Sequence, residues 1–360
     1  MRAHATGASE PERFDPVGPY LVLSRLDDPA SPVPVPERRY VARSADGDRT
    51  VLLGLPLPDA DPGRFRAEAE TSRYLLGPWA APATEVSARG DTPWHARPYL
   101  PVLPLPAALD AHGGPLPERT VRALGAALAE TLIIGHGQGL SHAGVSPAAV
   151  LLAADGPRLS CFGAVRAAAA DGTPRSGLPG LESGSLPPEQ AAGGPAQPAG
   201  DVYALGATLA YAATGYTVPE REELPAGLRT LISACLARDP AARPQPAALL
   251  DALAPAADGT PAPSPAAAPV PTEPDAAFGP AGRGTAGRGT AGLGPGWLPG
   301  RVIAALARQS ASLLAADVPA GKRPAGAPAT PAPATPADAA PPTPVPAGAT
   351  LPIAPTRRQD

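Results

Sequence analysis

The residues whose types and spacing bear most directly on chemistry lie near the middle of the chain. A loop runs from His142 to Leu152, and the hairpin after it turns at Asp155-Gly156-Pro157 and ends in Ser160-Cys161-Phe162-Gly163. An apolar run with helical spacing, Val121 to Leu132, precedes the loop. The pattern predicts a helix, a loop and two short strands that lead to a Phe-Gly pair.

This order of elements resembles the frame of a protein-kinase active centre, where phosphoryl transfer takes place. In that frame the loop reads H-R-D-L-x-x-x-N, and an aspartate precedes the Phe-Gly pair. Here the catalytic base is replaced by Gly144, the asparagine by Ala149 and the metal-binding aspartate by Cys161. The frame is present, but the side chains that perform its chemistry are absent.

Further stretches match the eukaryotic-like serine/threonine protein kinases of bacteria, which the chain resembles over about two-thirds of its length. Pro187–Gln190 resembles the A-P-E region, and Asp201–Gly206 resembles the start of the central large-lobe helix. Asp239–Pro244 resembles the turn that carries the family's structural arginine. The order and spacing of these matches are specific when taken together.

The resemblance implies an α+β, bilobal, protein-kinase-like fold over residues 18–253. The small, mainly β N-lobe is expected at about 18–98 and the mainly helical C-lobe at about 99–253. Residues 1–17 are polar and unpatterned, and we expect them to be disordered. Pro, Ala, Gly and Thr dominate residues 254–360, a composition that predicts a long disordered tail.

One apolar segment interrupts this tail. Trp297 introduces a run with an interrupted apolar face, which predicts a short helix at about 300–316. A helix of this length is marginal alone in water, so we expect it to order against a groove of this domain, of a partner or of a membrane surface.

The positions that hold phosphates in an active kinase are also altered. Asp27–Pro36 stands where the Gly-rich loop would be, and it contains four Pro and no Gly. The phosphate-holding lysine aligns with Gly54, and the chain's only lysine is Lys322. Glu68 aligns with the glutamate that pairs with that lysine, and without the lysine we interpret it as a solvated helix acid.

The expected adenine slot is altered as well. Arg39 and Leu52 replace the smaller residues that sandwich adenine, and Arg97 is the gatekeeper. These larger side chains should partly fill the slot, because protein interiors have little spare volume. Leu100 keeps a hinge N–H and is the weak candidate for a nucleotide contact.

The residues that the resemblance marks as architectural remain. His142 and Phe162 are interpreted as a packed core pair, with Gly163 completing the Phe-Gly motif. Glu189 and Arg243 match the family's buried ion pair. Asp201 matches the acid that accepts hydrogen bonds from the catalytic-loop backbone. Four side chains between Gly163 and Glu189 are candidate phosphorylation sites, although loops of this composition are usually only solvated: Thr173, Ser176, Ser183 and Ser185.

Composition excludes several function classes. The formal net charge of −4 argues against nucleic acid or an anionic membrane as partner. Cys161 and Cys235 lack metal-type spacing and suit a reducing cytosol. No apolar run is long enough to span a membrane and no signal-peptide pattern is present, so we expect a cytoplasmic protein without a transmembrane segment.

The losses together predict a pseudokinase, a regulatory or scaffolding module of bacterial serine/threonine kinase signalling that is not an enzyme. No metal and no cofactor are expected, and ATP–Mg²⁺ binding is not expected. The expected partner is a protein, such as an active kinase or its substrate. Two alternatives stay open: a nucleotide-sensing module that binds ATP without phosphotransfer, and an atypical active serine/threonine kinase. Nearby acids such as Asp155 and Asp171 lie on a hairpin turn and a loop and have no evident catalytic role.

Overall fold

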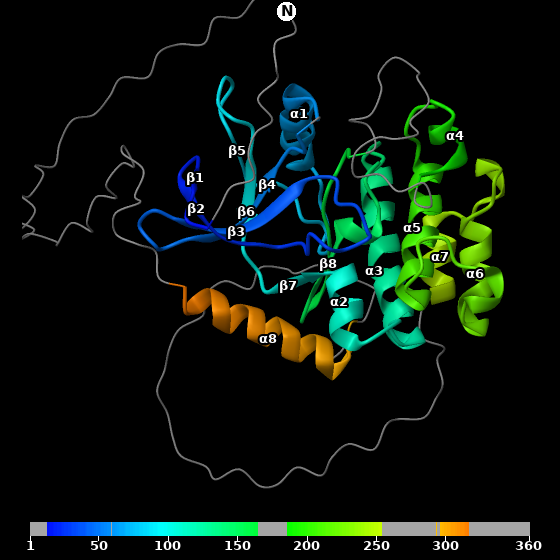
Figure 1. Ribbon diagram of the computed structural model, residues 1–360. Coiled ribbons are helices and arrows are strands. Elements are labelled where there is room, and N and C mark those ends of the chain that lie inside the picture. Colours follow the sequence, from blue (N-terminus) through cyan, green and yellow to red (C-terminus); the bar gives the residue numbers. More distant parts are fainter. Residues whose placement is uncertain (1–12, 59, 165–185, 254–292, 294–295, 317–360) are drawn as a thin grey trace, which may run out of the picture. The chain divides into compact units, whose positions relative to one another are not determined.

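The computed structural model describes residues 13–58, 60–164, 186–253, 293 and 296–316. These residues form a small, mainly β lobe and a mainly helical large lobe (Figure 1). The expected bilobal α+β fold is thereby confirmed. Most of the expected tail and the four candidate phosphorylation sites lie outside the described residues.

The small lobe is an antiparallel sheet with one helix. Its strand order is β1-β2-β3-β4-β6-β5. The elements are β1 (Pro16–Val17), β2 (Tyr20–Arg25), β3 (Arg38–Ser44), β4 (Thr50–Leu55), α1 (Pro62–Ser72), β5 (Glu85–Val86) and β6 (His95–Pro98). Residues 1–17 were expected to be disordered, but Pro16 and Val17 form strand β1, which is ordered by its pairing with β2.

Alternation along the strands divides this sheet into two faces. Tyr40 and Leu53 belong to an apolar cluster on one face. Val41 and Leu52, their neighbours in sequence, belong to a different apolar cluster that also includes large-lobe residues such as Leu151. The second face therefore looks toward the large lobe, and it carries the positions of interest.

The helix α1 begins where the sequence signals it. Asp61 is its N-cap, and the Asp61 side chain accepts a hydrogen bond of 2.7 Å from the Arg64 N–H. Pro62 occupies the first helical position, where a missing N–H has no cost.

The large lobe has a small sheet, ordered β7-β8-β9, and a group of helices. Its elements are β7 (Val102–Pro104), α2 (Leu105–His112), α3 (Glu118–Gly137), β8 (Val150–Ala153), β9 (Gly156–Leu159), α4 (Pro188–Ala191), α5 (Pro198–Thr214), α6 (Ala226–Cys235) and α7 (Pro246–Leu253). Short 3₁₀ turns lie at Pro147–Ala149, Arg221–Glu223 and Pro240–Ala242. Leu124, Leu128 and Leu205 are completely buried where α3 and α5 meet in the core.

A last helix, α8 (Gly300–Leu314), follows in the chain. It runs beside α2 and toward the small lobe (orange in Figure 1). Of the helices that the structure describes, none has the length and apolarity to cross a membrane.

Candidate functional site

The lysine position of the kinase frame is filled from the neighbouring strand. Gly54 on β4 pairs with Arg39 on β3 and with His95 on β6. A Cβ added at Gly54 would lie 2.4 Å from His95 Nε2 and 3.0 Å from Glu37 Oε2. A side chain at residue 54 therefore has no space, because the His95 ring and the Glu37 carboxylate already occupy it.

The base position is closed by backbone. A Cβ at Gly144 would lie 1.8 Å from the carbonyl oxygen of Cys161. Ala149, at the asparagine position, is completely buried at the end of a 3₁₀ turn, and its N–H donates to Ser146 Oγ at 3.2 Å. Neither position offers a group to a ligand in this conformation.

The backbone of the active-centre loop is nevertheless held in an unusual shape. Ala143 and Cys161 have positive φ angles of 51° and 60°, which L-residues rarely adopt. Asp201 accepts hydrogen bonds of 2.7 Å from the N–H groups of both His142 and Ala143. It also contacts His136 Nε2 at 2.9 Å. The Asp201 carboxylate therefore stabilises the strained backbone of this loop by hydrogen bonds.

His142 and Phe162 are buried and meet edge to face, with ring centroids 5.6 Å apart. The Gly163 N–H donates to the His142 carbonyl oxygen at 2.9 Å. Glu68 is half-buried, with Oε2 only 2.0 Å from where a Cβ of residue 163 would be, whereas the sequence indicated a solvated acid. These contacts join α1 to the Phe-Gly pair.

A buried ion pair fills the expected adenine slot. Arg39 Nε donates to Asp27 Oδ2 at 2.8 Å, a second guanidinium nitrogen contacts Oδ1, and both side chains are about 5% exposed. Arg39 Nη1 also donates to Ser160 Oγ at 3.4 Å. Burial would lower the pKa of Arg39, but the charge and hydrogen bonds of Asp27 outweigh burial and raise it. Asp27 therefore neutralises the charge of Arg39.

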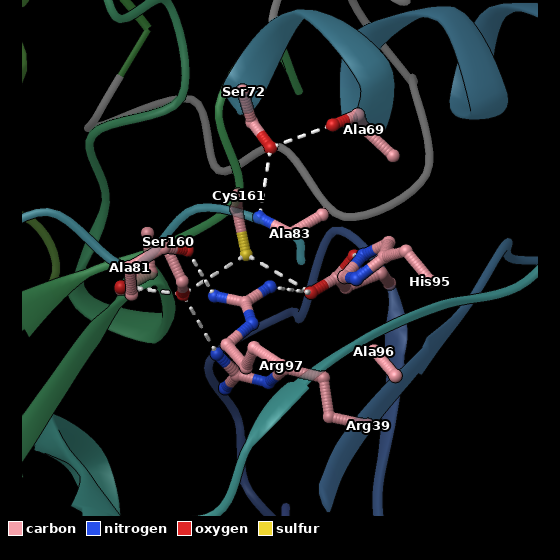
Figure 2. A network of polar contacts seen from close by, with 12 residues as sticks. Arg39, Ala69, Ser72, Ala81, Ala83, His95, Ala96, Arg97, Ser160 and Cys161 are labelled. Atoms are coloured by element: carbon pink, nitrogen blue, oxygen red, sulfur yellow. Dashed lines mark hydrogen bonds and ion pairs between the residues drawn. The ribbon is translucent and has the colours of Figure 1, made fainter. Parts of the chain in front are cut away.

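Beside this pair lies a second buried polar group, made of Glu37, His95 and Arg97 and called here the Glu37 cluster. Figure 2 labels its members His95 and Arg97. His95 Nε2 contacts Glu37 Oε2 at 2.6 Å, and Arg97 Nη2 lies 3.8 Å from Glu37 Oε1. Arg97 Nη1 donates to the Ala81 carbonyl oxygen at 2.6 Å. Burial would raise the pKa of Glu37, but His95 and then the two arginines lower it to about 2.

The Glu37 cluster reaches the metal-aspartate position. Cys161 Sγ lies 3.7 Å from Glu37 Oε1 and 3.4 Å from Ser160 Oγ. Burial, and then the charge of Glu37, raise the pKa of the Cys161 thiol to about 12, so the thiol is neutral at pH 7. Figure 2 shows Arg39 and Arg97 next to Ser160 and Cys161, with His95 on the other side of the group.

The space left between these side chains is small. A cavity of about 10 Å³ remains, which is room for one water molecule at most. It is lined by Leu26, Glu37, Arg39, Leu52, Leu53, Gly54, Arg97 and Leu151. Leu100, the hinge candidate, lies beyond β6 and is 38% exposed.

The family's nucleotide and metal do not fit this conformation. The cavity is too small for a nucleotide, and the three metal and base positions carry Cys161, Ala149 and Gly144. Within the described ranges, no group of three or more His, Cys, Asp or Glu side chains is arranged to hold a metal ion. The arginines supply positive charge to the cleft, but Asp27 and Glu37 already neutralise it.

The second architectural pair lies away from the cleft. Arg243 donates to both carboxylate oxygens of Glu189, at 2.6 and 2.7 Å, and its guanidinium lies 5.0 Å from the ring centre of Tyr203. The Arg243 side chain is 1% exposed and that of Glu189 24%. Burial would raise the pKa of Glu189, and the Arg243 hydrogen bond lowers it. The pair joins α4 to the turn before α7.

Two features of the site were missed from the sequence: the Asp27–Arg39 pair and the Glu37 cluster. A signal existed, because residues two apart on a strand share a face. Glu37 and Arg39 have this spacing, as do His95 and Arg97. Glu37 directly precedes β3, whereas Arg39 lies on β3 and His95 and Arg97 lie on β6, so the i, i+2 spacing in two neighbouring segments points to one buried polar group.

The chain was compared with protein families and with known proteins. No protein-family model matches the chain. A probable serine/threonine-protein kinase, PkwA of Thermomonospora curvata, is 34% identical over 259 residues, covering 66% of this chain and 34% of PkwA. The serine/threonine-protein kinase AfsK of Streptomyces coelicolor is 33% identical over 261 residues, covering 66% of this chain and 32% of AfsK. The chain belongs to the bacterial serine/threonine protein kinase family.

Two further facts define the extent of this kinship. The chain spans about a third of the length of the curated relatives it matches. The crystal structure of the Mycobacterium tuberculosis PknI kinase domain, in a mutant form, matches with a TM-score of 0.52 and 23% identity, covering 69% of this chain and all of that chain. At that identity the match shows the fold alone.

The comparisons correct two expectations. The prediction that the chain is not an enzyme is contradicted by relatives named as serine/threonine kinases at 32–34% identity over about two-thirds of the chain. The prediction of no cofactor is contradicted by the same membership, because protein kinases use ATP and Mg²⁺. Both predictions were inferred from the absence of motif residues, and the absence of these residues does not by itself measure activity.

Proposed function

We propose that this chain is an atypical serine/threonine protein kinase of bacterial signalling. The observation that carries the proposal is the identity of 32–34% to proteins named as serine/threonine kinases. The bilobal fold and the strained active-centre backbone support it. ATP is the phosphoryl donor of this proposal, a protein hydroxyl the acceptor and the cytoplasm its location.

In this proposal the cations of the cleft are Arg39 and Arg97, in place of the lysine that is absent at Gly54. A guanidinium stays charged at all relevant pH values and binds phosphate oxygens in a bidentate manner. Both arginines are within the polar group that contacts Ser160 and Cys161, next to the Phe-Gly pair. Their positive charge is the feature of this cleft that suits a phosphate.

In this proposal, the cleft of the described conformation is closed to a nucleotide. A nucleotide must displace Asp27 from Arg39, or Glu37 from Arg97, before a phosphate can take the place of a carboxylate. Exchange of one anion for another keeps the arginines paired, which avoids the cost of an uncompensated buried charge.

The test is phosphoryl transfer by the full chain. The protein is incubated with γ-labelled ATP, Mg²⁺ or Mn²⁺ and generic serine/threonine substrates, and label is counted after re-purification. The double variant Asp27→Asn, Arg39→Gln removes both charges of the cleft pair and keeps a polar side chain at each position. We expect transfer by the wild type and at least a tenfold loss in this variant, which corresponds to ~1.4 kcal/mol.

The matched control is Arg49→Gln with Glu85→Gln. This ion pair has the same chemistry and a 2.8 Å contact, but its side chains are 57% and 35% exposed. Transfer should be unchanged in the control. Nucleotide binding without incorporation of label into any protein would identify a nucleotide-sensing module. The absence of both nucleotide binding and label incorporation would reject the proposal.

A further inference from the structure

Helix α8 touches both lobes, although it is far from either in sequence. It lies beside α2 of the large lobe, and its last turn lies on β3 of the small lobe. Figure 1 shows it running from α2 past β7 toward β3. In between, Tyr99 of the interlobe linker contacts Gln309, with 3.4 Å between the Tyr99 hydroxyl and Gln309 Oε1.

The large-lobe end of α8 is anchored by Trp297. Its ring N–H donates to the Ala154 carbonyl oxygen at 2.9 Å, and its own carbonyl accepts from Thr120 Oγ1 at 2.9 Å. Val302 and Leu306 are buried in the large-lobe core together with residues of α2. This end completes the lobe's apolar core.

The small-lobe end is held by Arg43. Its two terminal guanidinium nitrogens donate to the carbonyl oxygens of Leu313 and Ala316, both at 2.7 Å. Leu313 lies in the last turn of α8, and Ala316 follows the end of the helix. Carbonyl oxygens at the C-terminal end of a helix attract cations, so the Arg43 guanidinium both hydrogen-bonds these oxygens and places a positive charge at that end.

The apolar residues at this end enter the cleft's own cluster. Leu313 and Ala316 are buried in the same cluster as Leu26, Leu52 and Leu151. Those three residues line the cavity between the lobes. Helix α8 therefore completes the packing of the place where a nucleotide base would bind.

We propose that α8 is an intramolecular cover of the interlobe cleft, which holds the two lobes together and must leave before the cleft can take a ligand. The nucleotide identity of that ligand rests on the proposed function, whereas the covering itself does not. A detached helix of fifteen residues is marginal in water, so release converts α8 into an unfolded segment that a partner's groove can bind.

Two adjacent leucines provide a matched test in the full chain. Leu313 is 6% exposed and Leu314 is 81% exposed. Leu313→Asp places a charge in the cluster, and Leu314→Asp places the same charge in water. The readout is the rate at which iodoacetamide alkylates Cys161 in the cleft, with Cys235, buried in the large-lobe core, as internal reference.

We expect Leu313→Asp to raise the Cys161 rate by about tenfold to a hundredfold, the range set by the loss of one buried leucine, with Cys235 unchanged. Leu314→Asp should react like the wild type. Equal Cys161 rates in the two variants would overturn the proposal. If Cys235 also speeds up, the decision passes to Arg43→Gln, which removes only two hydrogen bonds to the end of α8: a selective rise at Cys161 supports the cover, and no rise rejects it.

A fluorescent ATP analogue, titrated with Mg²⁺ into the same proteins, separates this inference from the proposed function. Tighter binding in Leu313→Asp than in the wild type supports both. A Cys161 that becomes reactive in a protein that still binds no nucleotide supports the cover and counts against the kinase proposal.

Discussion

Gly144 packs directly against the Cys161 backbone, since a Cβ at residue 144 would lie 1.8 Å from the Cys161 carbonyl oxygen. The catalytic-loop segment and the segment before the Phe-Gly pair are therefore closer than any other residue at 144 allows. The loss of the base is a change of backbone packing as well as a loss of one carboxylate.

Substitution at this contact should destabilise the fold. Gly144→Ala forces the two segments apart, and overpacking of this kind costs about 1–3 kcal/mol. Gly137→Ala is the matched control, because nothing lies within 4 Å of a Cβ there and the residue ends α3. Urea unfolding at pH 7 measures both variants. A Gly144→Ala protein as stable as Gly137→Ala would show that the contact is not close.

Acid stability should depend on Glu37. Its pKa falls from 4.5 to about 2 on folding, so its ionised form stabilises the folded state. This stabilisation is complete above pH about 4.5 and is lost as pH falls through about 2. It amounts to about 3 kcal/mol, since one pKa unit is ~1.4 kcal/mol.

Glu37→Gln removes this titration and keeps the shape of the side chain. The variant should be less stable than the wild type at neutral pH, and the difference in the free energy of unfolding should shrink between pH about 4.5 and about 2. Urea unfolding along that pH series is the measurement. A difference that stays constant with pH would contradict the pairing of the Glu37 carboxylate with His95 and Arg97.

The Glu189–Arg243 pair should matter far more than an exposed pair. Arg243→Ala leaves the Glu189 carboxylate partly buried without its partner, and loss of one member of a buried pair costs about 3–5 kcal/mol. The exposed Arg49–Glu85 pair offers the comparison, and Arg49→Ala should cost at most about 1 kcal/mol. Equal losses in thermal or urea unfolding would argue against an architectural role for Arg243.

Much of the fold follows from local signals along the chain. Asp61-Pro62 predicts the start of α1, and Gly215 predicts the end of α5, where it adopts a φ of 80°. Pairing between distant side chains is harder to predict. Arg39 aligns with a residue that sandwiches adenine, and only the register of β3 with its neighbours and the path of the loop after β2 bring Asp27 to it.

Helix α8 also shows that contacts between distant parts of the chain are hard to predict from sequence. The sequence predicts an interrupted apolar helix face made of Val302, Ile303, Leu306, Leu313 and Leu314. In the structure Ile303 and Leu314 are exposed and the other three are buried, and a face does not identify the groove that it enters. The groove is made by residues of β3, β4 and β8, which come together only in the folded lobes. Pattern therefore predicts the helix, and only the three-dimensional packing identifies what the helix covers.

The sequence separation of the α8 contacts also orders events during synthesis. The bond from Thr120 to Trp297 spans 177 residues, and the bond from Arg43 to Ala316 spans 273. Domains generally fold from the N-terminus as the chain is made, and contacts of such long separation form late. Both lobes thus emerge from the ribosome before α8 does, so every newly made molecule passes through a period in which its cleft is uncovered.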